Sequence, residues 1–229
     1  MQRDHLNGSL LAFAGVMALS FDGLLVRLAG THGMNIVFWR GLLMALALLL
    51  RTVDGRWAWT HLRLGGVDAG WVSAGFAATT ILFVLAILHT TVANVVVILA
   101  ASLLFAAIFS GLLLREWVPL RTWVAMLVCL GGIIGVFAGS LQAGGWLGDA
   151  LALLAALVVG INLTLLRRAP RVDRLAVIAA GGMLAALIAW PLATPLAIGL
   201  ESLAVLAGGL ALLSLAVHAA WGIRQKGTS

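Results

Sequence analysis

The chain has 229 residues, of which 63% are hydrophobic and only 10% are charged. A soluble domain carries about 25% charged residues, so this chain lacks the polar surface that a water-soluble fold needs. Its net charge of +6 would suit nucleic acid, but the arginines are scattered at the ends of apolar runs, which argues against a nucleic-acid partner. The composition therefore predicts an all-α polytopic membrane protein whose surroundings are the lipid bilayer.

Apolar runs long enough to cross the hydrocarbon core as helices recur along the whole chain, since a crossing takes about 20 residues. The first run also resembles a signal peptide ending near Ser20, but it continues beyond Asp22 and therefore favours a span. We predict eight transmembrane helices, at residues 8–29, 34–51, 68–88, 92–114, 120–139, 146–166, 174–195 and 202–222.

Basic residues lie in alternate connecting segments of these spans. They occur in the N-terminal tail, after the second, fourth and sixth spans, and in the C-terminal tail, whereas the intervening loops have no Lys or Arg. The positive-inside rule then predicts that the N- and C-termini both lie in the cytoplasm. Among the basic residues, only Arg27 and Arg40 depart from this pattern.

An internal repeat relates the two ends of the chain. A shift of 140 residues aligns the first span with the sixth and the second with the seventh, and places Asp22 on Asn162 and Gly41 on Gly181. Because a unit of five spans is odd-numbered, its second copy enters the membrane in the opposite sense, as in secondary transporters. We expect a complete five-helix unit over residues 1–140 and an incomplete, inverted second unit of three helices over 141–229.

Four stretches carry a family resemblance: residues 38–40 (FWR), 91–107 (beginning TVANVV), 112–117 (LLLREW) and 130–136 (LGGIIGV). They resemble the EamA family of the drug/metabolite transporter superfamily, well over residues 8–140 and weakly over 146–200. The resemblance implies a ten-helix inner-membrane permease of two inverted five-helix units that exports amino acids or related metabolites. Since the second unit here has only three predicted spans, we expect a shortened chain, which a second copy or the missing helices would complete.

Two charged residues inside predicted spans are the main site candidates. A charge within the bilayer costs at least about 2.5 kcal/mol, so Asp22 and Arg40 need a partner or a purpose. At 1.5 Å per residue, both lie about 9–12 Å below the outer surface. Two interpretations stay open: an ion pair that only fixes helix register, or a site where Arg40 binds a substrate carboxylate and Asp22 an amine or a proton.

Other intramembrane side chains are weaker candidates for substrate binding or coupling. Trp39 lies beside Arg40, and Asn94, Ser102 and Asn162 would either line a cavity or bond across helices. Stripes of small residues at four-residue spacing, 102–110 and 131–139, predict close helix packing. The chain has no nucleotide-binding loop, no H-E-x-x-H motif and no cluster of His and Cys, so we expect no enzyme, no metal site and no cofactor.

These observations predict a secondary transporter of small polar metabolites, an exporter of amino-acid-like compounds that alternates access between two inverted units. The alternative is a truncated membrane protein without transport activity, or an accessory subunit that needs a partner.

Overall fold

A computed structural model describes residues 26–27, 33–50, 56–114, 120–143, 145–169 and 172–193. By its contacts the chain divides into two compact units, Met1–Thr31 with Leu196–Ser229, and His32–Pro195. Nearly all of the described residues belong to the second unit. Asp22, most of the predicted span 8–29 and all of the span 202–222 lie outside the described residues, and the predicted boundary at residue 140 stays a prediction.

Every regular element in the described residues is a helix, as the composition predicts. The predicted spans between residues 34 and 195 agree with these helices, although the count of eight spans stays a prediction. Four stretches are long and apolar enough to cross a membrane: Leu62–His89, Val92–Leu113, Trp146–Arg168 and Arg174–Leu192. The helices are α2 (Gly33–Leu50), α3 (Arg56–His89), α4 (Val92–Leu99), α5 (Ala101–Leu114), α6 (Leu120–Ala143), α7 (Trp146–Arg168), α8 (Arg174–Ala189) and the short 3-10 helix η1 (Trp190–Leu192).

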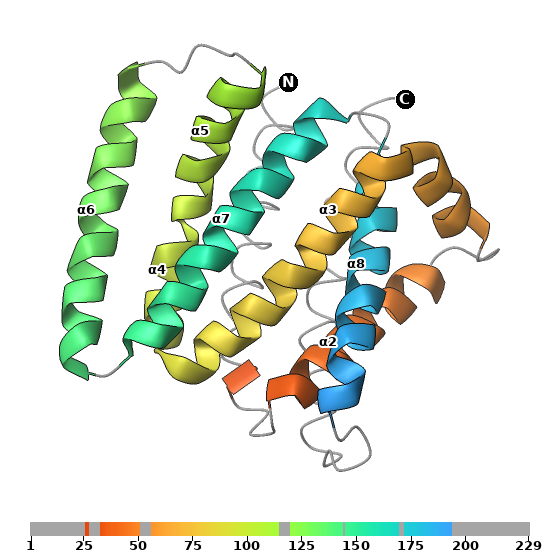
Figure 1. Cartoon of the computed structure of the whole chain (residues 1–229), viewed down its shortest axis with the longest axis horizontal. Helices are drawn as coiled ribbons and strands as arrows, with labels where there is room; N and C mark the ends of the chain where they lie inside the picture. Colours follow the sequence, from red (N-terminus) through yellow and green to blue (C-terminus); the bar gives the residue numbers. More distant parts are fainter. Residues whose placement is uncertain are drawn as a thin grey trace, which may run out of the picture. The chain divides into compact units, whose positions relative to one another are not determined.

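Two boundaries differ from the sequence prediction. The span predicted over 92–114 is divided at Ala100, between α4 and α5, although the backbone of Ala100 keeps right-handed helical angles. Arg56 and Arg63, predicted in a loop, lie instead within α3, which begins at Arg56. Gly66 has φ 56° and ψ −140°, so α3 consists of a basic first segment, a kink at Gly66 and a long apolar segment that ends at His89. Figure 1 shows this change of direction near the start of α3.

Replacing Gly66 with alanine is expected to destabilise the kink. Its φ and ψ lie in a region essentially reserved for glycine, and a side chain there costs about 1–3 kcal/mol. A Cβ on Gly66 would meet no atom within 4 Å, so the cost comes from the backbone alone. Gly70 is the matched control, because it is equally open but lacks the positive φ. Unfolding of both variants in mixed detergent micelles measures the difference, and equal midpoints would contradict the strain at Gly66.

Small residues mediate the helix packing. α3 packs along α7 and α8, α2 along α8, and α5 along α7 (Figure 1). In the described part most buried hydrophobic residues are alanine and none is leucine, whereas leucine is the commonest large hydrophobic residue on the exposed surface. Lipid solvates large apolar side chains, and small residues let helix backbones approach, so this distribution is typical of a membrane-embedded bundle. The chain is therefore a multi-pass membrane protein.

Glycines mark the closest helix contacts. A Cβ on Gly41 of α2 would collide with the backbone oxygen of Gly182 of α8. A Cβ on Gly160 of α7 would lie 2.5 Å from the Cβ of Phe105 and 2.9 Å from the backbone nitrogen of Ala106, both on α5. The small-residue stripe over 102–110 thus packs closely, as predicted, because Ala106 faces Gly160.

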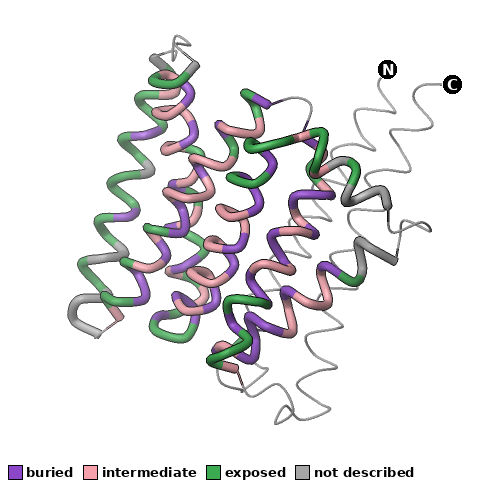
Figure 2. The backbone as a smooth tube through the Cα atoms, turned by 45° about the vertical axis from the view of Figure 1, so that its right-hand side comes forward, coloured by how far each residue is buried: buried purple, intermediate pink, exposed green. Residues whose placement is uncertain are grey.

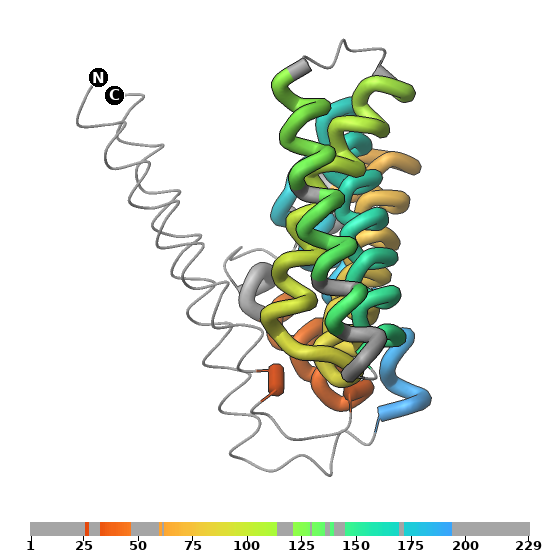
Figure 3. The backbone as a smooth tube through the Cα atoms, turned by 90° about the vertical axis from the view of Figure 1, so that its left-hand side faces the viewer, coloured from red at the N-terminus to blue at the C-terminus, as the bar shows by residue number. Residues whose placement is uncertain are grey.

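Helix α6 lies at the edge of the bundle (Figures 1 and 3). Exposed residues follow it along most of its length in Figure 2, among them Leu127 and Val128, which are 67% and 72% exposed. A Cβ on Gly131, Gly135 or Gly139 would meet no atom within 4 Å. The prediction that this second glycine stripe packs against another helix is therefore wrong for the described part of the chain.

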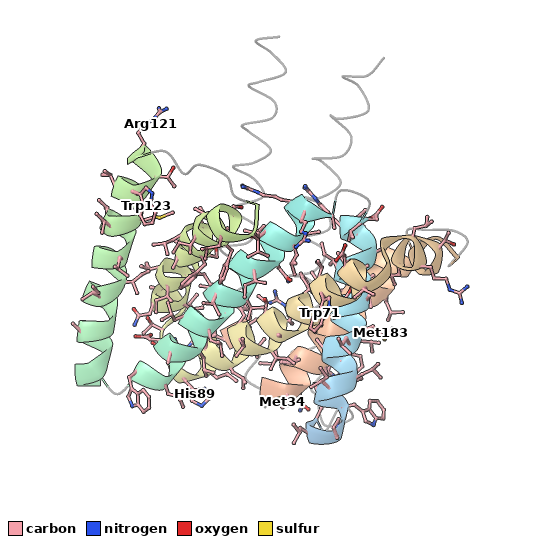
Figure 4. The ribbon with its side chains drawn as sticks, turned by 45° about the horizontal axis from the view of Figure 1, so that its top comes forward. Met34, Trp71, His89, Arg121, Trp123 and Met183 are labelled. Carbon is pink, nitrogen blue, oxygen red and sulfur yellow. The ribbon has the colours of Figure 1, made fainter. Side chains whose placement is uncertain are left out.

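Several tryptophans and arginines lie near helix ends, and Trp71 lies five residues after the kink at Gly66. Trp71, Trp123, Trp146 and Trp190 are all exposed, which suits rings at the two membrane interfaces. Figure 4 shows Arg121 and Trp123 at one end of α6 and His89 at the opposite end of the bundle. Arg167 and Arg168 end α7 and Arg174 begins α8, so the short segment between these two helices is flanked by arginines. The sequence-based prediction that this segment lies on the cytoplasmic side stays a prediction.

Candidate functional site

Arg40 lies on α2, where it reaches the neighbouring helix α3. Its Cζ atom is 5.3 Å from the centroid of the Phe83 ring, and the side chain is half-buried. Measured along the helix axes, Arg40 lies about 10 Å from the first residue of α2, and Phe83 lies about 9 Å from the last residue of α3. A desolvated cation over an aromatic face is stabilised by about 2 kcal/mol. The guanidinium group thus lies between α2 and α3, whereas its predicted depth below the outer membrane surface stays a prediction.

An aromatic cluster lies directly before Arg40 in the chain. The ring centroid of the buried Phe38 lies 5.5 Å from that of Trp39, edge to face, and 5.4 Å from that of Trp190 on η1. Such pairs contribute about 0.5–1.5 kcal/mol each beyond the area that they bury. The cluster ties α2 to η1, which directly follows α8, at a position two residues before Arg40.

Asn162 bonds across helices at a different depth. Its Nδ2 donates to the carbonyl oxygen of Val72, 3.3 Å away on α3, and a Cβ on Gly75 would collide with the Asn162 amide. The Oγ of Ser73, next to Val72, is buried without a hydrogen-bond partner in the structure. Val72 and Phe83 are about 16 Å apart along α3. The structure therefore does not bring Asn162 to Arg40, and gives Asn162 a helix-packing contact instead.

Asn94 contacts an acidic residue that the sequence analysis did not single out. On α4, its Nδ2 donates to the Oγ1 of Thr90 at 3.3 Å and to the Oδ1 of Asp149 at 3.5 Å. Asp149 lies in the first turn of α7 and is completely buried, with 0% of its surface exposed. The sequence feature that could have identified Asp149 is an acidic residue inside the predicted span 146–166, where a charge is costly. Asp149 is the fourth residue of that span, and an acidic residue in a first helical turn is ordinary because it interacts favourably with the helix dipole.

The α5–α7 interface carries the remaining polar contacts. The Oγ1 of Thr164 donates to the Gly160 carbonyl at 3.0 Å and lies 3.4 Å from that of Ala106. Arg167 donates from Nη1 to the Oγ of the buried Ser110 at 3.4 Å. Ser102 is the second residue of α5 and is half-buried. Within the described residues, no three His, Cys, Asp or Glu side chains gather in a way that would hold a metal ion.

The structure thus places the predicted site residues in separate groups. Trp39 and Arg40 lie together on α2, whereas Asn94, Ser102 and Asn162 lie on α4, α5 and α7. Asp22 is outside the described residues, so its proposed pairing with Arg40 stays a prediction. Two polar groups stand out as places for chemistry: the half-buried Arg40 over Phe83, and the buried Asp149 with Asn94.

Comparison with known proteins gives one match. The family model described as the EamA-like transporter family matches residues 6–138, more than half of the chain. Searches of curated proteins and of solved structures gave no match. The family match covers the region of the stronger predicted resemblance, whereas the weaker resemblance over 146–200 stays a prediction.

Proposed function

Because the chain belongs to the EamA-like transporter family, we propose that it is a secondary transporter of small polar metabolites that carry a carboxylate, and that it exports amino-acid-like compounds. The family membership confirms the predicted membrane transporter of the drug/metabolite type. The observation that supports the substrate class is the position of Arg40, a cation inside the bundle at the α2–α3 interface. The proposed location is a bacterial-type inner membrane with both termini in the cytoplasm.

Arginine suits this role by its geometry. A guanidinium group is planar, remains charged inside a membrane protein and binds a carboxylate through two parallel N–H···O bonds at its edge. The contact with Phe83 uses the face of the group, so the aromatic contact and carboxylate binding are compatible. The ring also orients the group before substrate arrives, which lowers the entropic cost of binding.

The packing of α2 and α8 supports the proposal of two inverted units. The shift of 140 residues makes these helices equivalent, and it places Gly41 on Gly181, next to Gly182. The two helices pack together, with Gly41 and Gly182 at their closest approach. Equivalent helices of inverted repeats meet in this way when a pseudo-two-fold axis in the membrane plane passes between them. In the proposed transport cycle the two inverted repeats, residues 1–140 and 141–229, rock about this contact.

Substrate counterflow with purified protein in liposomes tests the substrate class. Vesicles loaded with a panel of unlabelled amino acids should accumulate the labelled substrate, and excess external amino acid should block that accumulation. The corresponding decarboxylated amines should compete at least about tenfold more weakly, because they lack the group that Arg40 binds. Equal competition by amines and amino acids would contradict the proposed role of the carboxylate.

A further inference from the structure

We propose that Asp149 is a proton-binding site, which takes up and releases a proton during the transport cycle of this chain. The site lies at the corner where α3 ends, α4 begins and α7 begins, and it is separate from Arg40. The coupling role rests on the proposed transport function, whereas the proton site itself does not.

Local packing brings the carboxyl group into this corner. Gly148 lets the first turn of α7 lie against the end of α3, since a Cβ there would be 2.6 Å from the backbone carbon of His89 and from the nitrogen of Thr90. Figure 4 shows His89 at this end of α3, beside the start of α7. Thr91 caps α4 by accepting from the backbone N–H of Asn94 at 3.2 Å, which orients Asn94 toward Asp149.

The carboxyl group is poorly satisfied as an anion. A carboxylate has about four sites for accepted hydrogen bonds. Asp149 uses one, in the 3.5 Å contact with Asn94, and its Oδ2 is buried with no hydrogen-bond partner in the structure. Of Asp68, Asp149 and Asp173, the acidic residues that the structure describes, only Asp149 is buried. A buried, unpaired anion costs several kcal/mol, and a bound proton removes that cost.

A proton fits this corner better than a metal cation does. Sodium would need several oxygen ligands at once, whereas the structure places one hydrogen-bond partner, the Asn94 amide, on the Asp149 carboxyl group. A protonated carboxyl group needs one acceptor, and the Asn94 amide supplies its oxygen when it turns by 180° about its last bond. The two protonation states of Asp149 thus match the two orientations of one side chain.

Few other titratable groups lie on the helices that surround Asp149. The described residues of α4 and α5 contain none, and α6 contains only Arg121, at its far end, and Cys129. His89 on α3 is exposed, and its Nδ1 lies 2.7 Å from the carbonyl oxygen of Leu85. A proton-dependent change at this corner can therefore be assigned to Asp149 once His89 has been tested separately.

Protonation links this site to the transport cycle through hydration. Neutral Asp149 tolerates the buried position that the structure shows, whereas ionised Asp149 gains from water and favours a corner that is open to it. If the proton binds more tightly when the corner around Asp149 is closed, proton binding shifts the equilibrium between the closed and open corner toward the closed one. The size of the shift is set by the ratio of the two proton affinities. Loss of the proton would open the corner at this end of the bundle.

Infrared difference spectroscopy of the purified protein in lipid nanodiscs, recorded between high and low pH with carboxyl-labelled aspartate, tests the proton site directly. Wild-type protein should show a protonated-carboxyl band of a buried group that Asp149→Asn lacks entirely. The exposed-site control Asp68→Asn and the variant His89→Gln should both keep it. Identical wild-type and Asp149→Asn spectra would overturn the proposal. A band that changes when sodium replaces choline at fixed pH, but does not change with pH, would also overturn it.

Liposome assays then separate the site from the transport function. In wild type, a proton gradient should drive uptake above the level of simple exchange, and Asp149→Asn should lose that increment. Loss of the infrared band in Asp149→Asn supports the proton site even if wild-type protein shows no counterflow. The absence of counterflow would contradict only the proposed transport function. Counterflow with an unchanged proton response in Asp149→Asn would overturn the coupling role while the transport function stands.

Discussion

Arg40→Gln is expected to abolish most substrate binding while the protein still folds. A hydrogen bond to a charged group contributes about 1.5–3 kcal/mol, so substrate affinity in counterflow should fall by at least about tenfold. Arg40→Lys should be intermediate, because lysine keeps the charge but cannot bind a carboxylate through two parallel N–H groups. Phe83→Leu should weaken binding through lost orientation of the guanidinium group, which contacts that ring at 5.3 Å.

The matched control for this series is Arg121→Gln. Arg121 is exposed at the start of α6, at the end of the bundle opposite His89 (Figure 4). It should leave affinity unchanged. Size-exclusion profiles and helical content, measured for each variant, show whether a loss of counterflow reflects binding or folding. A folded Arg40→Gln variant with wild-type affinity would contradict the role of Arg40 and leave it a helix-packing residue.

Gly41→Ala is expected to destabilise the packing of α2 against α8. The added Cβ would meet the backbone oxygen of Gly182 and lie 3.1 Å from the backbone nitrogen of Ala186, and neither atom can move without shifting α8. Overpacking of this kind costs about 1–3 kcal/mol. The unfolding midpoint in mixed detergent micelles should fall accordingly, and counterflow should fall with it, because the proposed rocking motion occurs at this contact.

Gly132→Ala on α6 serves as its control. A Cβ there would meet no atom within 4 Å, and alanine favours a helix over glycine by about 1 kcal/mol. This variant should be as stable as wild type or slightly more stable. If Gly41→Ala and Gly132→Ala unfolded at the same midpoint, the close approach of α2 and α8 would not contribute to stability.

Hydropathy alone predicted most of the helices, because a crossing helix must satisfy its own backbone and present about 20 apolar residues. The same signal missed the first segment of α3. Residues 56–65 are too polar to count as a span, and the turn that ends them depends on the backbone angles of Gly66. Hydropathy and composition do not predict the backbone φ and ψ of a single glycine. The helical segment with Arg56 and Arg63 was therefore predicted as a loop.

The candidate site was less accessible from the sequence, because its contacts join distant parts of the chain. Counting residues placed Arg40 inside the predicted span 34–51, but its neighbour Phe83 depends on how α2 packs against α3. Asn94 was identified as polar within a span, yet Asp149, its partner across the bundle, was not singled out. Stripes of small residues were equally ambiguous: the stripe over 102–110 packs against α7, whereas a Cβ on the α6 glycines Gly131, Gly135 and Gly139 would meet no atom within 4 Å. Pattern alone does not distinguish a packed face from a lipid-facing one.

Counterflow of labelled amino acids by the purified wild-type chain in liposomes is the most direct test of the transporter assignment. The proposed function predicts transient accumulation of label above its external concentration in vesicles loaded with the unlabelled compound, and none in protein-free vesicles. Helical content measured on the same vesicles shows that the protein is folded. A folded chain that accumulates no compound of the amino-acid panel would contradict the proposed function.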